Sequence, residues 1–89
     1  MITIEIFGLE GCDTCEELKE ALSDISGATI RMNNVQHDLE ARVEMAWHDL
    51  PETPAILVKI GGIVVFREYA IEDVEKTVGI IRVNLSEKK

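Results

Sequence analysis

Hydrophobic and polar residues alternate at the start of the chain in the pattern of a β-strand. Ile2, Ile4 and Ile6 are separated by single polar residues, and a period of two places them on one face of a strand. From residue 12 onward, apolar residues recur every three or four positions, which is the period of a helix. This second stripe consists of Cys15, Leu18, Leu22 and Ile25. The pattern therefore predicts a strand, a short loop and a helix that ends at Ser26-Gly27.

The middle of the chain predicts a second strand and a second helix. Residues 28–32 form a short strand-like segment that ends at a polar Asn-Asn break. A helical stripe follows, and we expect its apolar residues to face the core: Leu39, Val43, Ala46 and Leu50. Asp38 can cap the start of this helix, and Pro51 ends it because a proline disfavours helical backbone in the residue before it. Trp47 lies one position beyond the stripe and is expected to pack at the edge of the core.

The last third of the chain predicts a β-hairpin followed by a helix. Two β-rich runs, residues 55–60 and 63–67, are joined by Gly61-Gly62, and a two-glycine link is typical of a hairpin turn. The final helix is expected to have no good N-cap, and its apolar stripe consists of Ile71, Val74, Val78, Ile81 and Leu85. Residues 87–89 are expected to form a frayed tail.

The resulting order, β-α-β-α-β-β-α, predicts an α/β domain in which helices pack on the faces of one mixed sheet. A chain of 89 residues has room for a single domain, residues 1–89, and its hydrophobic content of 46% is typical of folded proteins. The apolar runs are too short to cross a bilayer, and the chain opens on a strand rather than on a signal-peptide pattern. We therefore expect a cytoplasmic protein that acts as a monomer.

The net charge of the chain limits the classes of partner that it is expected to bind. Seventeen acidic residues against nine basic ones give a formal net charge of -8. This charge opposes binding to nucleic-acid phosphates and to anionic membrane surfaces, and it favours basic partners. We therefore expect neither nucleic acid nor membrane among the partners.

The chemistry that the sequence indicates lies at its only two cysteines, Cys12 and Cys15, at the expected start of the first helix. Two thiols at this spacing can join as a disulfide and open again, and a helix start stabilises a thiolate through its unpaired N–H groups. We expect Cys12 to attack a substrate disulfide, and Cys15 to displace the substrate and close the Cys12–Cys15 bond. Nearby carboxylates oppose ionisation of the thiol and predict a more reducing couple than a basic site would have. These carboxylates belong to Glu10, Asp13, Glu16 and Glu17.

A metal site is the alternative at this pair. Zinc needs four ligands, and only His37 and His48 could complete a set, at a wider spacing than is usual for two histidine ligands. A cluster shared between two chains stays open, because each chain would contribute two thiolates. The redox interpretation itself requires no cofactor.

Three features, in this order, resemble the thioredoxin superfamily. They are Cys12-Asp13-Thr14-Cys15 at the first β-to-α junction, Thr53-Pro54 before the third strand, and Gly61-Gly62 after it. The resemblance covers essentially the whole chain, whose length is similar to that of glutaredoxins and short glutaredoxin-like thioredoxins. It implies a thioredoxin-like fold with a four-stranded mixed sheet and a cis peptide bond before Pro54. It also implies a substrate site beside the catalytic cysteines, formed by Gly11, Asp13, Thr14, Thr53 and Pro54.

The motif departs from both standard subfamilies. Asp13-Thr14 stands where glutaredoxins have Pro-Tyr, and the acidic surroundings oppose anionic glutathione. The resemblance therefore implies a thiol-disulfide oxidoreductase that reduces disulfide-containing proteins. Its electrons would come from a thioredoxin reductase or another dithiol donor. The alternatives are a glutathione-dependent glutaredoxin and a non-enzymatic module that binds an iron-sulfur cluster, zinc or a partner protein.

Overall fold

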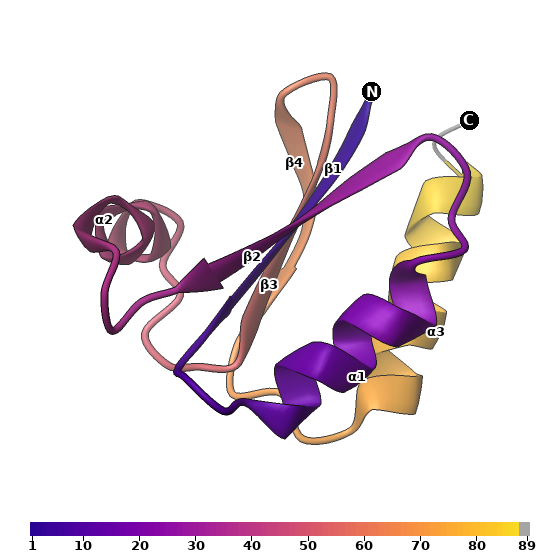
Figure 1. Ribbon diagram of the computed structural model, residues 1–89. Helices are drawn as coiled ribbons and strands as arrows, with labels where there is room; N and C mark the ends of the chain where they lie inside the picture. Colours follow the sequence, from indigo (N-terminus) through magenta and orange to yellow (C-terminus); the bar gives the residue numbers. More distant parts are fainter. Residues whose placement is uncertain (88–89) are drawn as a thin grey trace.

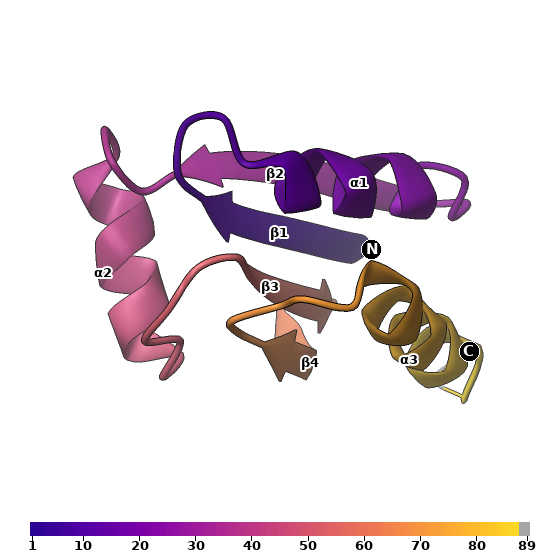
Figure 2. The same ribbon diagram turned by 90° about the horizontal axis from the view of Figure 1, so that it is seen from below.

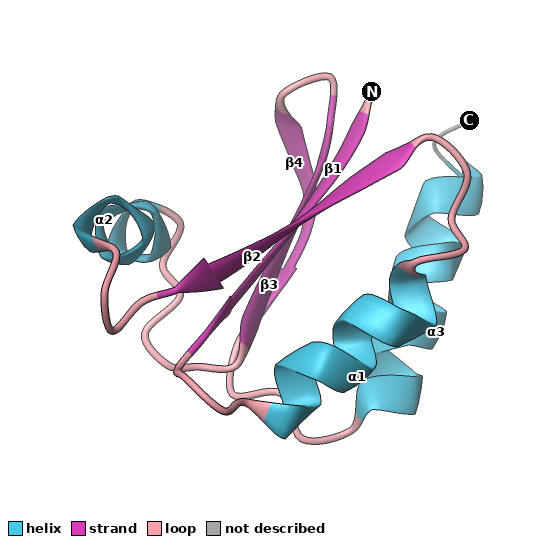
Figure 3. Cartoon of the chain, viewed as in Figure 1, coloured by secondary structure: helices cyan, strands magenta, loops and turns pink. Residues whose placement is uncertain are grey.

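The computed structural model describes residues 1–87 (Figure 1). Of the tail expected at residues 87–89, Glu87 ends the last helix, and residues 88–89 lie outside the described residues. The elements follow the predicted order β-α-β-α-β-β-α (Figure 3). They are β1 (Ile2–Gly8), α1 (Asp13–Leu22), β2 (Ala28–Asn34), α2 (Leu39–Trp47), β3 (Ala55–Ile60), β4 (Ile63–Glu68) and α3 (Val74–Glu87). No helix in this part of the chain is long and apolar enough to cross a membrane.

The four strands form one mixed sheet in the order β2-β1-β3-β4. β1 is parallel to β2 and antiparallel to β3, and β3 and β4 form the predicted hairpin. Gly61 and Gly62 make the turn with φ values of 58° and 84°, a conformation that glycine adopts without steric cost. The register pairs Gly8 with Asn34 and Phe7 with Ala55. The end of β1 therefore lies between the end of β2 and the start of β3.

The larger core lies between the sheet and two helices. α1 and α3 pack side by side on one face, whereas α2 covers the other face (Figures 1 and 2). Ile4 and Ile6 of β1 point toward α1 and α3, as the period-two pattern predicts. The fully buried side chains of this core are Ile4, Ile6, Leu18, Leu22, Ile56, Val58 and Ile81. Each of them contributes roughly 1.5–3 kcal/mol through the apolar surface that it removes from water.

Three helix boundaries differ from the expected ones. α2 ends at Trp47 rather than just before Pro51. α1 ends at Leu22 rather than at Gly27, because the Ser23 hydroxyl donates to the Glu20 carbonyl and the chain then turns. α3 begins at Val74 and does have an N-cap, since Asp73 Oδ1 accepts the Lys76 N–H at 3.1 Å. The Asp38 cap of α2 is confirmed, with its Oδ1 3.2 Å from the Ala41 nitrogen.

The predicted buried face of α2 is wrong. Leu39 and Val43 are 66% and 60% exposed, and Trp47, expected at the edge of the core, is 81% exposed. The helix instead buries Ala41 and Met45. Apolar residues lie on both sides of α2, and the side with Ala41 and Met45 packs in the smaller core on that face of the sheet (Figure 2). Of the predicted stripe, Leu50 is buried, after the end of the helix, whereas Ala46 is exposed.

Candidate functional site

Cys12 and Cys15 are joined in a disulfide at the N-terminus of α1, with their Cα atoms 5.3 Å apart. Cys12 is the N-cap of the helix, and its Sγ accepts the Cys15 N–H at 3.1 Å. Once the disulfide is reduced, this N–H group and the positive end of the helix stabilise negative charge on the Cys12 sulfur. The local structure therefore favours Cys12 as a thiolate.

The two sulfurs differ in their access to solvent. Cys12 is partly exposed, whereas Cys15 is 3% exposed and packs with Leu18 and Leu22 in the larger core. Cys15 Sγ lies 3.9 Å from the Phe7 carbonyl oxygen at the end of β1. An incoming disulfide can thus reach Cys12, while Cys15 can react only with a sulfur already held at Cys12.

The glycines around the pair have distinct functions. Gly11 has a φ of 76° and makes the turn that leads into Cys12. Gly8, at the end of β1, leaves space for the disulfide, because a Cβ there would overlap Cys15 Sγ and lie 3.2 Å from Cys12 Sγ. Gly8 is not among the residues that the sequence pattern predicts for the site. The sequence feature that could have indicated its importance is its position: it is a glycine at the end of a strand, directly before the loop that leads to the cysteines.

The motif residues between the cysteines belong to the first turn of α1. Asp13 is exposed and Thr14 is half-buried. Asp13 and Glu16 place negative charge near the start of the helix, where the helix dipole stabilises them and where they oppose ionisation of Cys12.

Thr53 and Pro54 lie at the same end of the sheet as the disulfide. The peptide bond between them is cis, as the resemblance implied. Pro54 precedes Ala55, which pairs with Phe7 next to Gly8, and the Pro54 carbonyl accepts the Ile71 N–H at 3.1 Å. The two residues therefore approach the cysteines from the β3 side of β1.

A cavity of about 220 Å³ opens on the opposite, β2 side of the disulfide. Cys12 and Cys15 line it, together with Gly11 and Asp13 from the predicted site. Glu16, one of the carboxylates expected near the cysteines, also lines it, as do Leu9 and Met32, which were not predicted to form part of the site. Thr53, Pro54 and Thr14 are not among its lining residues.

The residues considered for a metal site lie in other surroundings. His37 Nε2 is 3.8 Å from Glu10 Oε2, on an exposed part of the surface. Within residues 1–87, no group of three or more His, Cys, Asp or Glu side chains could hold a metal ion.

The chain resembles known proteins in its fold. No protein-family model and no curated protein matches this sequence. Among solved structures, thioredoxin 1 from Thermosipho africanus TCF52B superimposes with a TM-score of 0.72 at 14% identity, covering 97% of each chain. A mutant thioredoxin from Halobacterium salinarum NRC-1 gives 0.69 at 14% identity, covering 93% of this chain and 74% of that one. A designed protein gives 0.69 at 20% identity, covering 97% of this chain and 74% of that one.

Proposed function

Because this chain has the thioredoxin-like fold, we propose that it is a thiol-disulfide oxidoreductase that reduces protein disulfides through Cys12 and Cys15. The observation that carries the proposal is the unequal setting of the two sulfurs. Cys12 caps the helix and is accessible, whereas Cys15 is buried behind it. A structural disulfide has no need of this asymmetry, but an attacking thiol and a resolving thiol require it.

The reaction transfers two electrons from the dithiol to the substrate. The Cys12 thiolate attacks one sulfur of the substrate disulfide, forms a mixed disulfide and releases the other substrate sulfur as a thiolate. Cys15, after losing its proton, attacks the Cys12 sulfur, closes the Cys12–Cys15 bond and releases the second substrate thiolate. A thioredoxin reductase or another dithiol donor then returns the two electrons. No cofactor bound to this chain is needed.

The substrate is proposed to lie across Cys12. Gly11, Asp13 and Thr14 would contact it at the helix start, and Thr53 and Pro54 would contact it from the β3 side. The exposed carboxylates at the helix start favour a protein segment over anionic glutathione. The protein is proposed to act as a monomer in the cytoplasm. In this reducing compartment, cysteine pairs cycle between the dithiol and the disulfide and are not kept oxidised.

The test is disulfide reduction with a simple dithiol as electron donor. Wild-type protein should accelerate reduction of insulin by dithiothreitol, and Cys12→Ser should return the rate to that of dithiothreitol alone. Pre-reduced Cys15→Ser, mixed with insulin after dithiothreitol has been removed, should accumulate a mixed disulfide on Cys12 that intact-mass measurement detects. Equal rates for Cys12→Ser and wild type would overturn the proposal.

Two further measurements separate the alternatives. Replacing dithiothreitol by glutathione as the donor distinguishes a glutaredoxin, which would be faster with glutathione. Metal analysis and a visible absorption spectrum of anaerobically purified protein distinguish a module that binds a cluster or zinc.

A further inference from the structure

The cavity on the β2 side of the disulfide has no function in the mechanism above. It lies between the start of α1 and the end of β2, and both sulfur-bearing residues form part of its wall. Its volume of about 220 Å³ is below the range of roughly 300–1,000 Å³ that is typical of small-molecule sites. The size therefore suits one side chain of a bound protein better than a separate ligand.

Part of the cavity wall is apolar and open to solvent, although Asn33 and Asn34 of β2 also line it. Leu9 and Met32 are 49% and 40% exposed, although both are large hydrophobic residues. Met32 stands on β2, an edge strand of the sheet, and Leu9 follows β1. Together with the disulfide they offer apolar contact to an aliphatic chain.

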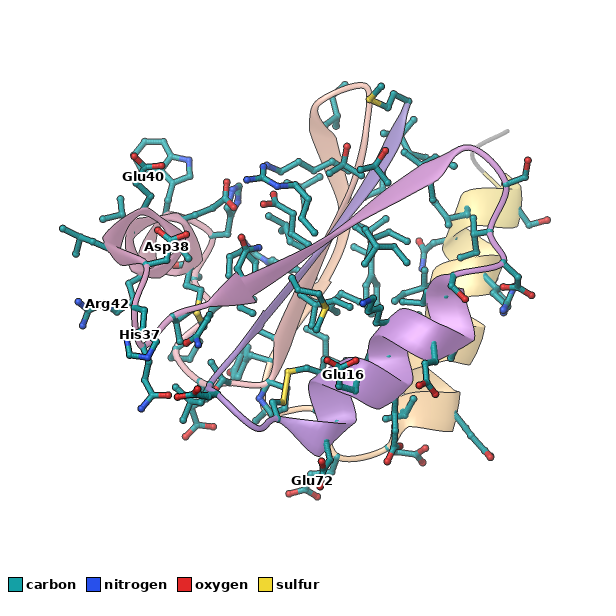
Figure 4. All side chains as sticks on the ribbon, in the orientation of Figure 1. Glu16, His37, Asp38, Glu40, Arg42 and Glu72 are labelled. Carbon is teal, nitrogen blue, oxygen red and sulfur yellow. A yellow bond between two sulfur atoms is a disulfide. The ribbon has the colours of Figure 1, made fainter. Side chains whose placement is uncertain are left out.

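The helix side of the cavity carries negative charge. Asp13 and Glu16 both line it, and a spacing of three residues puts them on the same side of α1. Figure 4 shows Glu16 beside the disulfide at the start of α1. Within residues 1–87 neither carboxylate forms an ion pair, in contrast to Glu10, which faces His37.

An apolar wall next to two free carboxylates matches a side chain with an aliphatic stem and a cationic head. We propose that this cavity is a specificity pocket for the Lys or Arg side chain that neighbours the reacting cysteine of a substrate. The inference rests on the proposed function and adds the substrate class. β1 lies between β2 and β3, so the pocket would hold the substrate on the side of Cys12 opposite to Thr53-Pro54.

The experiment uses the full chain and three disulfide peptides that differ at the residue next to the cysteine: lysine, norleucine or glutamate. Norleucine has a similar stem without the charge. At low ionic strength, kcat/KM should be about fivefold higher for the lysine peptide than for the norleucine peptide, the effect expected of two partly exposed ion pairs. The glutamate peptide should be the slowest. The preference for lysine should shrink toward onefold as salt screens the carboxylates.

The variant that tests the pocket is the double substitution Asp13→Asn and Glu16→Gln. The readout is the lysine-to-norleucine rate ratio within each variant, because a changed Cys12 reactivity alters both rates alike. The ratio should fall close to one in the double variant. Glu20→Gln is the control, since it removes one negative charge from an exposed position of α1 outside the cavity, and its ratio should stay at about fivefold.

Equal rates for the lysine and norleucine peptides with the wild-type chain would overturn the proposed specificity pocket. An unchanged lysine-to-norleucine rate ratio in the double variant would overturn it as well. Loss of the preference in Glu20→Gln as well would also overturn it, because a diffuse field rather than the cavity would then select the charge. If wild type reduced neither these peptides nor insulin, the proposed function itself would fail.

Discussion

Gly8 is the residue that lets the disulfide pack against the end of β1. Its φ lies outside the left-handed region, so the requirement at this position is space and not backbone conformation. The atom that would collide with a Cβ is Cys15 Sγ, which comes from the following helix. A sequence shows the glycine but not the sulfur that it accommodates, because that contact exists only once α1 has packed on the sheet.

Gly8→Ala should therefore destabilise the oxidised protein by about 1–3 kcal/mol, the usual cost of inserting a methyl group into a filled space. Gly79→Ala is the matched control, since Gly79 is exposed inside α3 and a Cβ there meets no atom within 4 Å. It should stabilise the protein by about 0.5–1 kcal/mol, because alanine has the higher helix propensity. Urea unfolding of both variants measures the two effects. Equal free energies of unfolding for Gly8→Ala and wild type would contradict the prediction.

A buried carboxylate lies on the other face of β1. Glu5 is 3% exposed, with Lys59 Nζ 3.2 Å from its Oε2 and Arg31 Nη1 3.6 Å from its Oε1. Lys59 Nζ is also 3.6 Å from Glu44 Oε2 of α2. Burial raises the pKa of Glu5, but hydrogen bonds from Glu44 and Lys59 and the charges of Lys59 and Arg31 outweigh it and hold the pKa below its ordinary value. Burial, followed by the hydrogen bond and charge of Glu5, raises the pKa of Glu44.

This arrangement makes stability depend on pH through Glu44. A carboxyl whose pKa is raised by folding holds its proton more tightly in the folded chain than in the unfolded chain. Its favourable contribution to the free energy of unfolding is therefore complete below the unfolded pKa and is lost as the pH rises through the folded pKa. Glu44→Gln keeps an N–H donor for Glu5 and removes this titration. The stability of Glu44→Gln relative to wild type should therefore increase from about pH 4 to pH 7.

Urea unfolding at both pH values checks this expectation. Val43→Ala, at an exposed position of the same helix, removes no ionisable group and is the control; it should differ from wild type by a nearly constant amount. A difference between Glu44→Gln and wild type that does not change with pH would contradict the assignment.

At the scale of the element, α2 shows why periodicity predicts a helix more securely than its orientation. Apolar residues recur on two sides, and the spacing of Leu39, Val43 and Ala46 selects one of them as the buried side. The structure buries Ala41 and Met45 instead. α1 was oriented correctly because the remainder of its surface is charged, so its pattern allowed one solution.

Truncations on the two sides of α2 should therefore have unequal costs. Met45→Ala should destabilise the protein by roughly 2–3 kcal/mol, because it opens a cavity under the helix next to Phe7 and Leu57. Val43→Ala, at a position that is 60% exposed, should change stability by less than about 0.5 kcal/mol. Both values follow from urea unfolding. A larger loss for Val43→Ala than for Met45→Ala would restore the orientation expected from the sequence.

At the scale of the whole molecule, local patterns give the elements but not the site. The pairings of Phe7 with Ala55 and of Gly8 with Asn34 join residues far apart in the chain. The position of Thr53-Pro54 beside the cysteines was accordingly inferred from a resemblance and not from spacing. The cavity is harder still to foresee, because Leu9, Met32 and Glu16 come from three separate segments. Leu9 and Glu16 lie near the cysteines in the sequence, but Met32 reaches the disulfide through the pairing of β1 with β2.

The net charge of -8 acts on the molecule as a whole. Salt weakens exposed ion pairs such as Arg82–Asp24 and Arg67–Asp49, but surface pairs of this kind contribute little to stability. Repulsion among the excess carboxylates destabilises the compact state more than the unfolded chain. The same salt screens this repulsion and so stabilises the folded protein. The melting temperature should therefore rise by a few degrees, roughly 2–5 °C, between low salt and about 0.2 M NaCl.

Circular dichroism across this range of salt tests the balance. Removing two exposed acidic residues, with Glu20→Gln and Glu72→Gln, should raise the melting temperature at low salt and reduce its response to salt. A melting temperature that falls as salt is added would show that ion pairs outweigh repulsion. In that case the excess negative charge would not destabilise the folded chain, and its main effect would be on the partners that approach Cys12.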